Sequence, residues 1–310
     1  YESAGVLWAY MGPPEKQPPP PNFMFNNVPV GNIIAIRIPI YCNYLQALEG
    51  NIDSTHLGTL HARYEQAVPI DTDTDRPGYC SPNFTLYIQA KYRYANIDVQ
   101  DTAYGVRLIA TRPTDAGNQH VRINCHVLPY TTFIASQGMG SGVMMQVPVD
   151  DENTLSFAWF NNAVPGDEPF EQERIPYWTS PLVDEKTGRW VDTHIMNQDF
   201  IAWVGQNAVA DRTQEHLGGS DGGIIMMRRR MLEEARIVAD GGEPKAIIHD
   251  PEKNRKLYLP RQGRNRTGPA FGARTDGKAP RTGLLAKQPQ TILDEMDKIW
   301  DEHGSKVTTL

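Results

Sequence analysis

Four side chains that can bind a metal or move a proton lie close together in the stretch EGNIDSTHLGTLH, residues 49–61. They are Glu49, Asp53, His56 and His61. Imidazole nitrogens combined with carboxylate oxygens are common ligands of protein-bound iron and zinc. Two histidines on a polar helix are more often ordinary surface residues, so their spacing has to decide between the two interpretations.

The spacing in a straight helix brings three of the four side chains to one face and leaves the fourth off it. Asp53 lies four residues after Glu49 and three before His56, so in a helix the three share one face. His56 and His61 are five residues apart, which at about 100° per residue places them off a common face of a straight α-helix. The two histidines converge if the helix loosens between them, and Gly58 stands in that interval.

Two imidazoles and one carboxylate with open coordination positions are typical of non-haem Fe(II) oxygenases. The third ligand has several candidates elsewhere in the chain, because Asp192, His194, Asp199 and Asp211 all follow far downstream. Asp192 and His194 come after GRWV and favour a loop end. Asp199 precedes the apolar Phe200, so its carboxylate can face a packed interior, although a lone Asp near a helix start is most often a cap.

The surrounding pattern predicts an α+β fold that positions these residues on helices beside a long sheet. Apolar and aromatic strands between polar turns predict an antiparallel meander from about residue 83 to 163. Helices are predicted at residues 43–64, 197–206, 222–239 and 289–303. A sheet curved around a long helix leaves an apolar cavity between them, in which a small molecule can bind.

Composition narrows the class of protein. The 310 residues are 40% hydrophobic and 22% charged, with a net charge of -7, as in ordinary globular proteins. This charge argues against binding to nucleic acid or to an anionic membrane surface, and no apolar run is long enough to span a bilayer. Three cysteines without paired spacing fit a reducing compartment, so we expect a cytoplasmic, bacterial protein.

Two longer motifs resemble a known family. The stretch NYLQALEGNIDSTHLGTLH is similar to the iron-binding helix of Rieske-type aromatic ring-hydroxylating oxygenases. Residues 197–235, which begin NQDFIAWVGQ, resemble the phthalate dioxygenase and aromatic O-demethylase branch of that family. The first motif has the order N, E, then D-x-x-H-x-x-x-x-H, which matches Asn43, Glu49, Asp53, His56 and His61.

The resemblance implies a role for each matched residue. His56, His61 and Asp199 would bind one mononuclear Fe(II), Asp53 would pass an electron from the Rieske cluster of a neighbouring subunit, and Asn43 would line the iron pocket at greater distance. The fold would be a helix-grip, an antiparallel sheet wrapped around helices. The reaction would use O2 to hydroxylate, dihydroxylate or O-demethylate an aromatic compound. The expected partners are a reductase or ferredoxin as electron donor and further copies of the chain in a homotrimer or hexamer.

The same resemblance predicts the domain organisation. Residues 1–12 would be the tail of an upstream Rieske domain, 13–30 a proline-rich linker and 31–310 the catalytic domain. The chain starts without Met in an apolar strand, so we expect it to begin inside a longer polypeptide. The CxH and CxxH pairs that hold a [2Fe–2S] cluster do not occur, so this chain would not ligate the cluster expected in the full-length protein.

Two arginines in predicted strands are candidates for substrate binding. Arg107, in YGVRLIA, and Arg122, in HVRINCHV, would hold an aromatic carboxylate if they point into the cavity, or would face solvent if they do not. Two alternatives to an oxygenase remain. One is a helix-grip module that binds an apolar small molecule without a metal, and the other is a closed structural zinc site.

Overall fold

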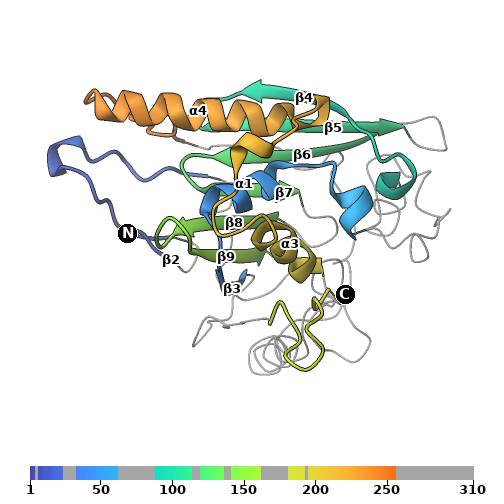
Figure 1. The fold of residues 1–310 in the computed structure, drawn as a ribbon. Coiled ribbons are helices and arrows are strands. Elements are labelled where there is room, and N and C mark those ends of the chain that lie inside the picture. The colour runs from blue at the N-terminus through green and yellow to red at the C-terminus, as the bar shows by residue number, and fades with distance from the viewer. Residues whose placement is uncertain are drawn as a thin grey trace, which may run out of the picture.

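The structure is a computed structural model that describes residues 1–3, 6–23, 33–61, 88–113, 119–135, 141–161, 181–192 and 195–255. Within these residues, seven strands form one antiparallel sheet in the order β3-β9-β8-β7-β6-β5-β4 (Figure 1). The strands are β3 (Ile33–Ile40), β4 (Asn96–Asp101), β5 (Gly105–Pro113), β6 (Gln119–Val127), β7 (Thr131–Ala135), β8 (Ser141–Pro148) and β9 (Thr154–Asn161).

The predicted meander is confirmed, because β4 to β9 are neighbours in chain order. Its predicted start is wrong: residues 88–91 are helical, and β4 begins only at Asn96. The strand β3 comes earlier in the chain and extends the sheet beyond β9. Since the two ends of the sheet come from different parts of the sequence, the strand pattern alone does not place β3.

Three helices lie beside the sheet, and several short elements complete the described fold. The helices are α1 (Tyr44–Ile52), α3 (Ile195–Val204) and α4 (Gly222–Ala239). The short elements are β1 (Glu2–Ser3), β2 (Val6–Leu7), η1 (Pro14–Lys16), η4 (Leu57–His61), η7 (Arg212–Gln214) and η8 (Gly219–Asp221).

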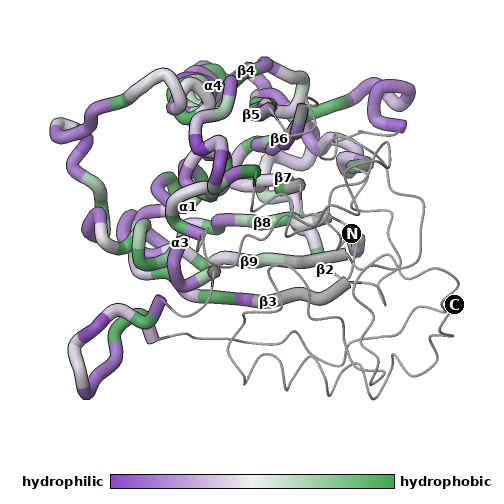
Figure 2. Tube along the Cα trace, turned by 90° about the vertical axis from the view of Figure 1, so that its right-hand side faces the viewer, coloured by the Kyte–Doolittle hydropathy of each residue, from purple (hydrophilic) through white to green (hydrophobic). Residues whose placement is uncertain are grey.

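The helices pack on one face of the sheet, which is called here the helix face. Helix α1 contacts β6, β7 and β8 as well as α3, whereas α4 lies along β4 and β5 (Figure 1). Figure 2 shows α1 and α3 together on the same side of the strands. Buried Leu48 and Ile52 of α1 meet Leu108 of β5 and Met227 of α4 in one apolar cluster. Each such side chain contributes about 1.5–3 kcal/mol of hydrophobic stabilisation.

The opposite face of the sheet has its own apolar cluster. There Cys125, Phe133 and Val143 are buried together with Phe23 from the N-terminal segment, and Trp8 packs at the edge of this group. The N-terminal residues therefore cover the face that the helices leave open. The domain boundaries predicted at residues 12 and 30 stay predictions.

The α+β, helix-grip fold class is confirmed by this arrangement of helices across one face of a large antiparallel sheet. The predicted helix at 222–239 coincides with α4, and the one at 197–206 corresponds to α3. The predicted helix at 289–303 lies outside the described residues. Among the helices that are described, none has the length and apolar character needed to cross a membrane.

Candidate metal site

Helix α1 ends earlier than the sequence pattern predicts, and Asp53 is the cause. The helix predicted at 43–64 is not continuous: it is interrupted after Ile52, because Asp53 adopts an extended conformation with ψ of 142°, and residues 62–64 lie outside the described residues. Its carboxylate accepts the backbone N–H groups of Thr55 at 2.9 Å and His56 at 2.7 Å. An aspartate that bonds to the amides two and three residues ahead offers the backbone an alternative to the helix. The turn directs His56 away from the axis of α1.

A short π-helical turn, η4, then brings His61 beside His56. A π-helix bonds residues five apart, which is the separation of these two histidines. Their rings meet edge to face, with centroids 5.1 Å apart. The turn lies against the helical residues 88–91: a Cβ added to Gly58 would be 2.2 Å from the carbonyl oxygen of Gln89. Glycine at this position therefore permits a close approach that fixes η4.

The third member of the group comes from α3. Phe200 and Trp203 are buried in the apolar cluster between α3, α1 and the sheet, so they hold the helix in place. Gly50 of α1 allows this contact, since a Cβ there would be 2.1 Å from Nε1 of Trp203. The packing places Asp199 at the end of α1, beside the two histidines.

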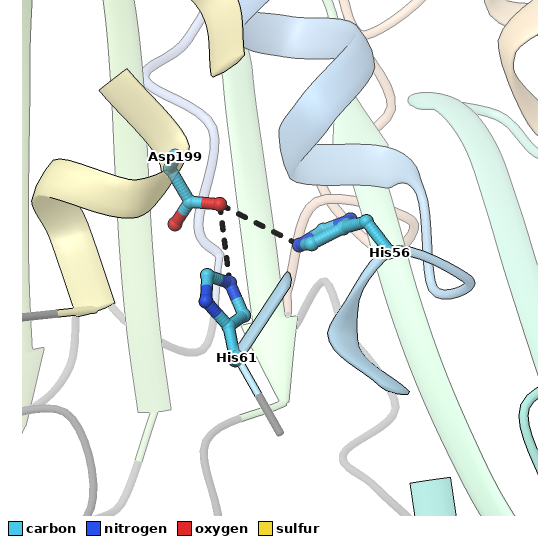
Figure 3. A group of neighbouring side chains, drawn as sticks. All are labelled: His56, His61 and Asp199. Atoms are coloured by element: carbon cyan, nitrogen blue, oxygen red, sulfur yellow. Dashed lines mark ion pairs between the residues drawn. The ribbon is translucent and has the colours of Figure 1, made fainter. Parts of the chain in front are cut away.

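His56, His61 and Asp199 point toward one another (Figure 3). The Asp199 Oδ1 atom lies 3.1 Å from Nε2 of His61 and 3.6 Å from Nε2 of His56. One ligand atom from each residue lies within 4.8 Å of the others. Two imidazole nitrogens and one carboxylate oxygen form the donor set of a non-haem Fe(II) site with open coordination positions. The residues present therefore fit a mononuclear iron.

Both histidines have their other ring nitrogen held, as metal-binding imidazoles generally require. The Nδ1 atom of His56 lies 2.7 Å from Oδ2 of Asp53, and Nδ1 of His61 lies 3.0 Å from Oε1 of Gln198. These contacts leave each Nε2 atom facing the space beside Asp199.

The charges of the site are coupled. Burial alone would raise the pKa of Asp53, but hydrogen bonds and attraction from His56 lower this pKa to about 2, so the carboxylate is ionised. Burial of His61 favours its neutral ring, but attraction and hydrogen bonding to Asp199, together with the hydrogen bond to Gln198, outweigh burial and raise the pKa of His61. A bound cation would replace that proton between the two side chains, as is expected of a metal ligand.

Arg122 lies on the helix face, close to the three residues. It pairs with Ala110 of β5, which belongs to the cluster beneath α1 and α4. Its side chain is buried, and among the described residues its Nη1 atom has no hydrogen-bond partner. Burial and the neighbouring Arg112 lower the pKa of Arg122 to about 10, against attraction from Asp53 and Asp199. Arg122 is therefore a buried cation with an unused donor.

Arg107 lies on the other face of the sheet. It pairs with Cys125, which belongs to the cluster around Phe133. Its guanidinium donates to the hydroxyl of Tyr104 and to the side chain of Gln100. Its role in substrate binding stays a prediction, but the structure does not bring it together with His56, His61 and Asp199.

Asn43 caps the N-terminus of α1, at the end of the helix opposite Asp53. Its side chain accepts the N–H of Leu45 and donates to the carbonyl of Asp151. A nine-residue helix is about 14 Å long, so this cap is distant from the histidines. A role in lining the iron pocket stays a prediction.

The other candidate ligands are elsewhere. Glu49 is buried between Arg212 and Arg228, Asp211 caps η7, and the side chain of Asp192 is exposed. His194 lies outside the described residues.

Two residues of the site were not anticipated from the sequence. Gln198 directly precedes Asp199 and binds His61, as described above. Arg112 is fully buried and donates to the carbonyl of Ser54, in the turn that follows Asp53. Arg112 could have been found, because it shares its strand face with the apolar Leu108, where a charged residue is unexpected.

Comparison with known proteins identifies the class. The family model described as "LigXa C-terminal domain like" matches residues 9–171 and 168–257. The chain belongs to this family. It is 37% identical over 265 residues to the 5,5'-dehydrodivanillate O-demethylase oxygenase subunit of a Sphingobium species, covering 83% of the chain and 56% of that relative.

Other relatives agree with the predicted resemblance to Rieske-type aromatic oxygenases, which is confirmed. The chain is 31% identical over 261 residues to the phthalate 4,5-dioxygenase oxygenase subunit of Pseudomonas putida, covering 75% of the chain and 57% of the relative. The chain thus spans little more than half the length of these relatives. Among solved structures, dicamba monooxygenase with bound dicamba aligns at 12% identity and a TM-score of 0.39, over 67% of this chain and 60% of that one.

Proposed function

We propose that the chain is the catalytic part of an oxygenase subunit that oxidises an aromatic acid with O2. The convergence of His56, His61 and Asp199, from segments about 140 residues apart in the chain, carries the proposal. The names of the relatives, which describe oxygenase subunits acting on aromatic compounds, support it.

In this proposal His56, His61 and Asp199 hold one Fe(II), which supplies the activation of O2. Three protein ligands would leave further coordination positions of the iron for O2. Asp53 and Gln198 keep the Nε2 atoms of the two histidines available to the metal. Asp53 is the proposed entry point for the electron, since its carboxylate contacts His56 and is still partly accessible.

Arg122 is the proposed anchor for the substrate. A buried guanidinium with an unused Nη1 donor binds a carboxylate more strongly than it binds a neutral group. Holding an aromatic carboxylate there would place the ring, or an O-methyl carbon on it, beside the iron. Whether the ring or the methyl carbon reacts then depends on how the remainder of the substrate is oriented.

The partners expected from the resemblance belong to the same proposal. A [2Fe–2S] cluster in the full-length protein, which the cysteines of this chain do not ligate, would deliver electrons from a reductase or ferredoxin. The working assembly would be a homotrimer or hexamer, because the electron would cross between subunits, and the enzyme would be cytoplasmic.

The test combines metal analysis with ligand variants. We expect about one iron per chain beyond any cluster iron. Iron and acid-labile sulfide are measured together to separate mononuclear iron from cluster iron, since a [2Fe–2S] cluster adds two irons and two sulfides. His56→Ala and Asp199→Ala should lose this iron and all turnover when supplied with reductase and cluster. His249→Ala, at an exposed histidine paired with Glu243, should retain both. Full turnover in either ligand variant would exclude the proposed function, and a metal-free protein that still bound its ligand would favour a carrier.

A further inference from the structure

Gln198 makes two hydrogen bonds that together fix the orientation of its side-chain amide. It lies in the first turn of α3, directly before Asp199. Its Nε2 atom donates to the backbone carbonyl of Asp192 at 3.0 Å. Its Oε1 atom faces Nδ1 of His61 at 3.0 Å. A carbonyl oxygen can only accept, so the amide must present its nitrogen to Asp192 and its oxygen to His61.

This orientation determines which nitrogen of His61 carries the proton. An amide oxygen is an acceptor, so Nδ1 of His61 must donate to it. If a metal ion replaces the proton between His61 and Asp199, the neutral imidazole keeps its one proton at Nδ1 and the lone pair of Nε2 is left for the metal. Nε2 lies 3.1 Å from Asp199, where the metal would bind.

The anchor of Gln198 is itself held in place. The neighbouring Asn197 is fully buried and donates to the carbonyls of Val191 at 2.7 Å and Pro181 at 3.2 Å. Two consecutive side chains of α3 thus bind the backbone of the segment 181–192. The carbonyl of Asp192 is therefore held in position and orients the Gln198 amide.

The two histidines differ in the charge of the group behind them. His56 has the carboxylate of Asp53 at its Nδ1 atom, whereas His61 has a neutral amide. A carboxylate partner makes a ligating imidazole a stronger donor than a neutral partner does. The site therefore contains one electron-rich histidine and one ordinary histidine.

The geometry points to Gln198 as a positioning residue that selects the Nδ1–H tautomer of His61 and, through it, sets the metal affinity and redox potential of the site. This inference rests on the proposed iron site. It gives Gln198, which precedes the proposed ligand Asp199, a task other than binding the metal. The carbonyl of Asp192 orients the Gln198 amide, and the amide in turn orients the His61 imidazole.

Two substitutions separate this role from a merely structural one. Gln198→Leu removes both hydrogen bonds. Gln198→Glu keeps an acceptor for His61 but loses the donor to the Asp192 carbonyl. Gln206→Leu is the matched control, because Gln206 follows the same helix, is exposed and donates to the carbonyl of Ala202.

The first measurement is the Fe(II) affinity of the whole protein, determined after iron removal by anaerobic competition with a chelator. The second measurement is the ring ¹⁵N chemical shifts of His61 in the Zn(II)-loaded protein. We expect Gln198→Leu to weaken Fe(II) binding by about 10- to 100-fold. Gln198→Glu should bind at least as tightly as the wild type and lower the midpoint potential of the iron. The wild type should show protonated Nδ1, and Gln206→Leu should match it in every measurement.

If Gln198→Leu and Gln198→Glu weakened Fe(II) binding equally, the inference would be overturned. That result is expected if Gln198 acts only through its hydrogen bond to the Asp192 carbonyl, which both variants lose. Wild-type affinity in both variants would overturn it as well. In either case the proposed iron site stands if the wild type binds Fe(II) and His61→Ala does not. Binding unaffected by His61→Ala would instead exclude the iron site and the inference together.

Discussion

The rings of His56 and His61 lie edge to face, 5.1 Å apart between centroids, although five positions separate the residues in the chain. An α-helix does not produce this relationship. It arises because Asp53 ends α1 and a π-helical turn follows. The convergence of the two histidines therefore depends on an irregular backbone, and mutations of its supports should weaken the proposed metal site.

Gly58→Ala should damage the site without removing a ligand. The new Cβ would lie 2.2 Å from the Gln89 carbonyl oxygen, so η4 or the residues 88–91 must move. We expect a stability loss of about 1–3 kcal/mol, as for overpacking generally, and at least a tenfold loss of Fe(II) affinity. Chemical denaturation and metal titration measure the two effects. Gly219→Ala, where a Cβ meets nothing within 4 Å, is the control, and equal behaviour of the two variants would contradict the packing argument.

Arg122→Met should change substrate selection more than metal binding. We expect KM for a carboxylated aromatic substrate to rise about tenfold or more, since a hydrogen bond to a charged group contributes about 1.5–3 kcal/mol. The methyl ester of the same compound should be affected much less. Arg107→Met is the comparison, because Arg107 lies on the opposite face of the sheet. Steady-state kinetics with the acid and its methyl ester measure this effect. If only Arg107→Met lost the preference for the acid over the ester, the binding role would belong to Arg107.

The sequence predicts those features that depend on local pattern. Strand alternation indicated the meander, and α4 has the predicted bounds of 222–239. The early end of α1 was also open to prediction, because Asp53 is followed by Ser and Thr, a composition typical of a side-chain-capped turn.

The remaining parts of the site depend on contacts between distant segments. Gln198 and Asp199 are neighbours on one helix, so helical geometry does not indicate that both side chains reach His61. The faces of Arg107 and Arg122 follow from the register of β5 against β6, which the strand patterns alone do not determine. The family resemblance, rather than spacing in the chain, distinguishes Asp199 from the other three candidates for the third ligand.

Glu49→Gln should destabilise the fold while leaving the metal ligands intact. Residue Glu49 is 7% exposed, and its carboxylate accepts from Arg212 at 2.8 Å and from Arg228 at 2.6 Å, which connects α1 to η7 and α4. Loss of its charge leaves Glu215 as the carboxylate that both arginines still contact within the described part of the chain. We expect a loss of about 2 kcal/mol in the free energy of unfolding, measured with urea.

The control for Glu49 is an exposed ion pair. Glu252→Gln removes a partner of Arg255 at 3.8 Å, with both side chains at least 80% exposed, and should change stability by less than about 0.5 kcal/mol. A similar small change in Glu49→Gln would mean that the buried carboxylate contributes little to holding the three elements together.

His126 should make the fold sensitive to mild acid. Its ring is buried on β6, with Nε2 3.2 Å from the Pro129 carbonyl, and burial lowers its pKa to about 4. The unfolded chain binds this proton near pH 6.5, so between pH 6.5 and 4 the unfolded state holds more protons and stability falls as the pH falls. The contribution is fully present above pH 6.5, and its loss at pH 4 is at most roughly 3 kcal/mol.

His126→Gln tests this directly, because glutamine can still donate to the Pro129 carbonyl but does not titrate. Urea unfolding at several pH values between 7 and 4 should give a flatter profile for the variant than for the wild type. A residual slope is expected from His120, whose pKa burial and two neighbouring arginines lower to about 3. Parallel profiles for wild type and His126→Gln would show that the His126 ring is not held neutral by the fold.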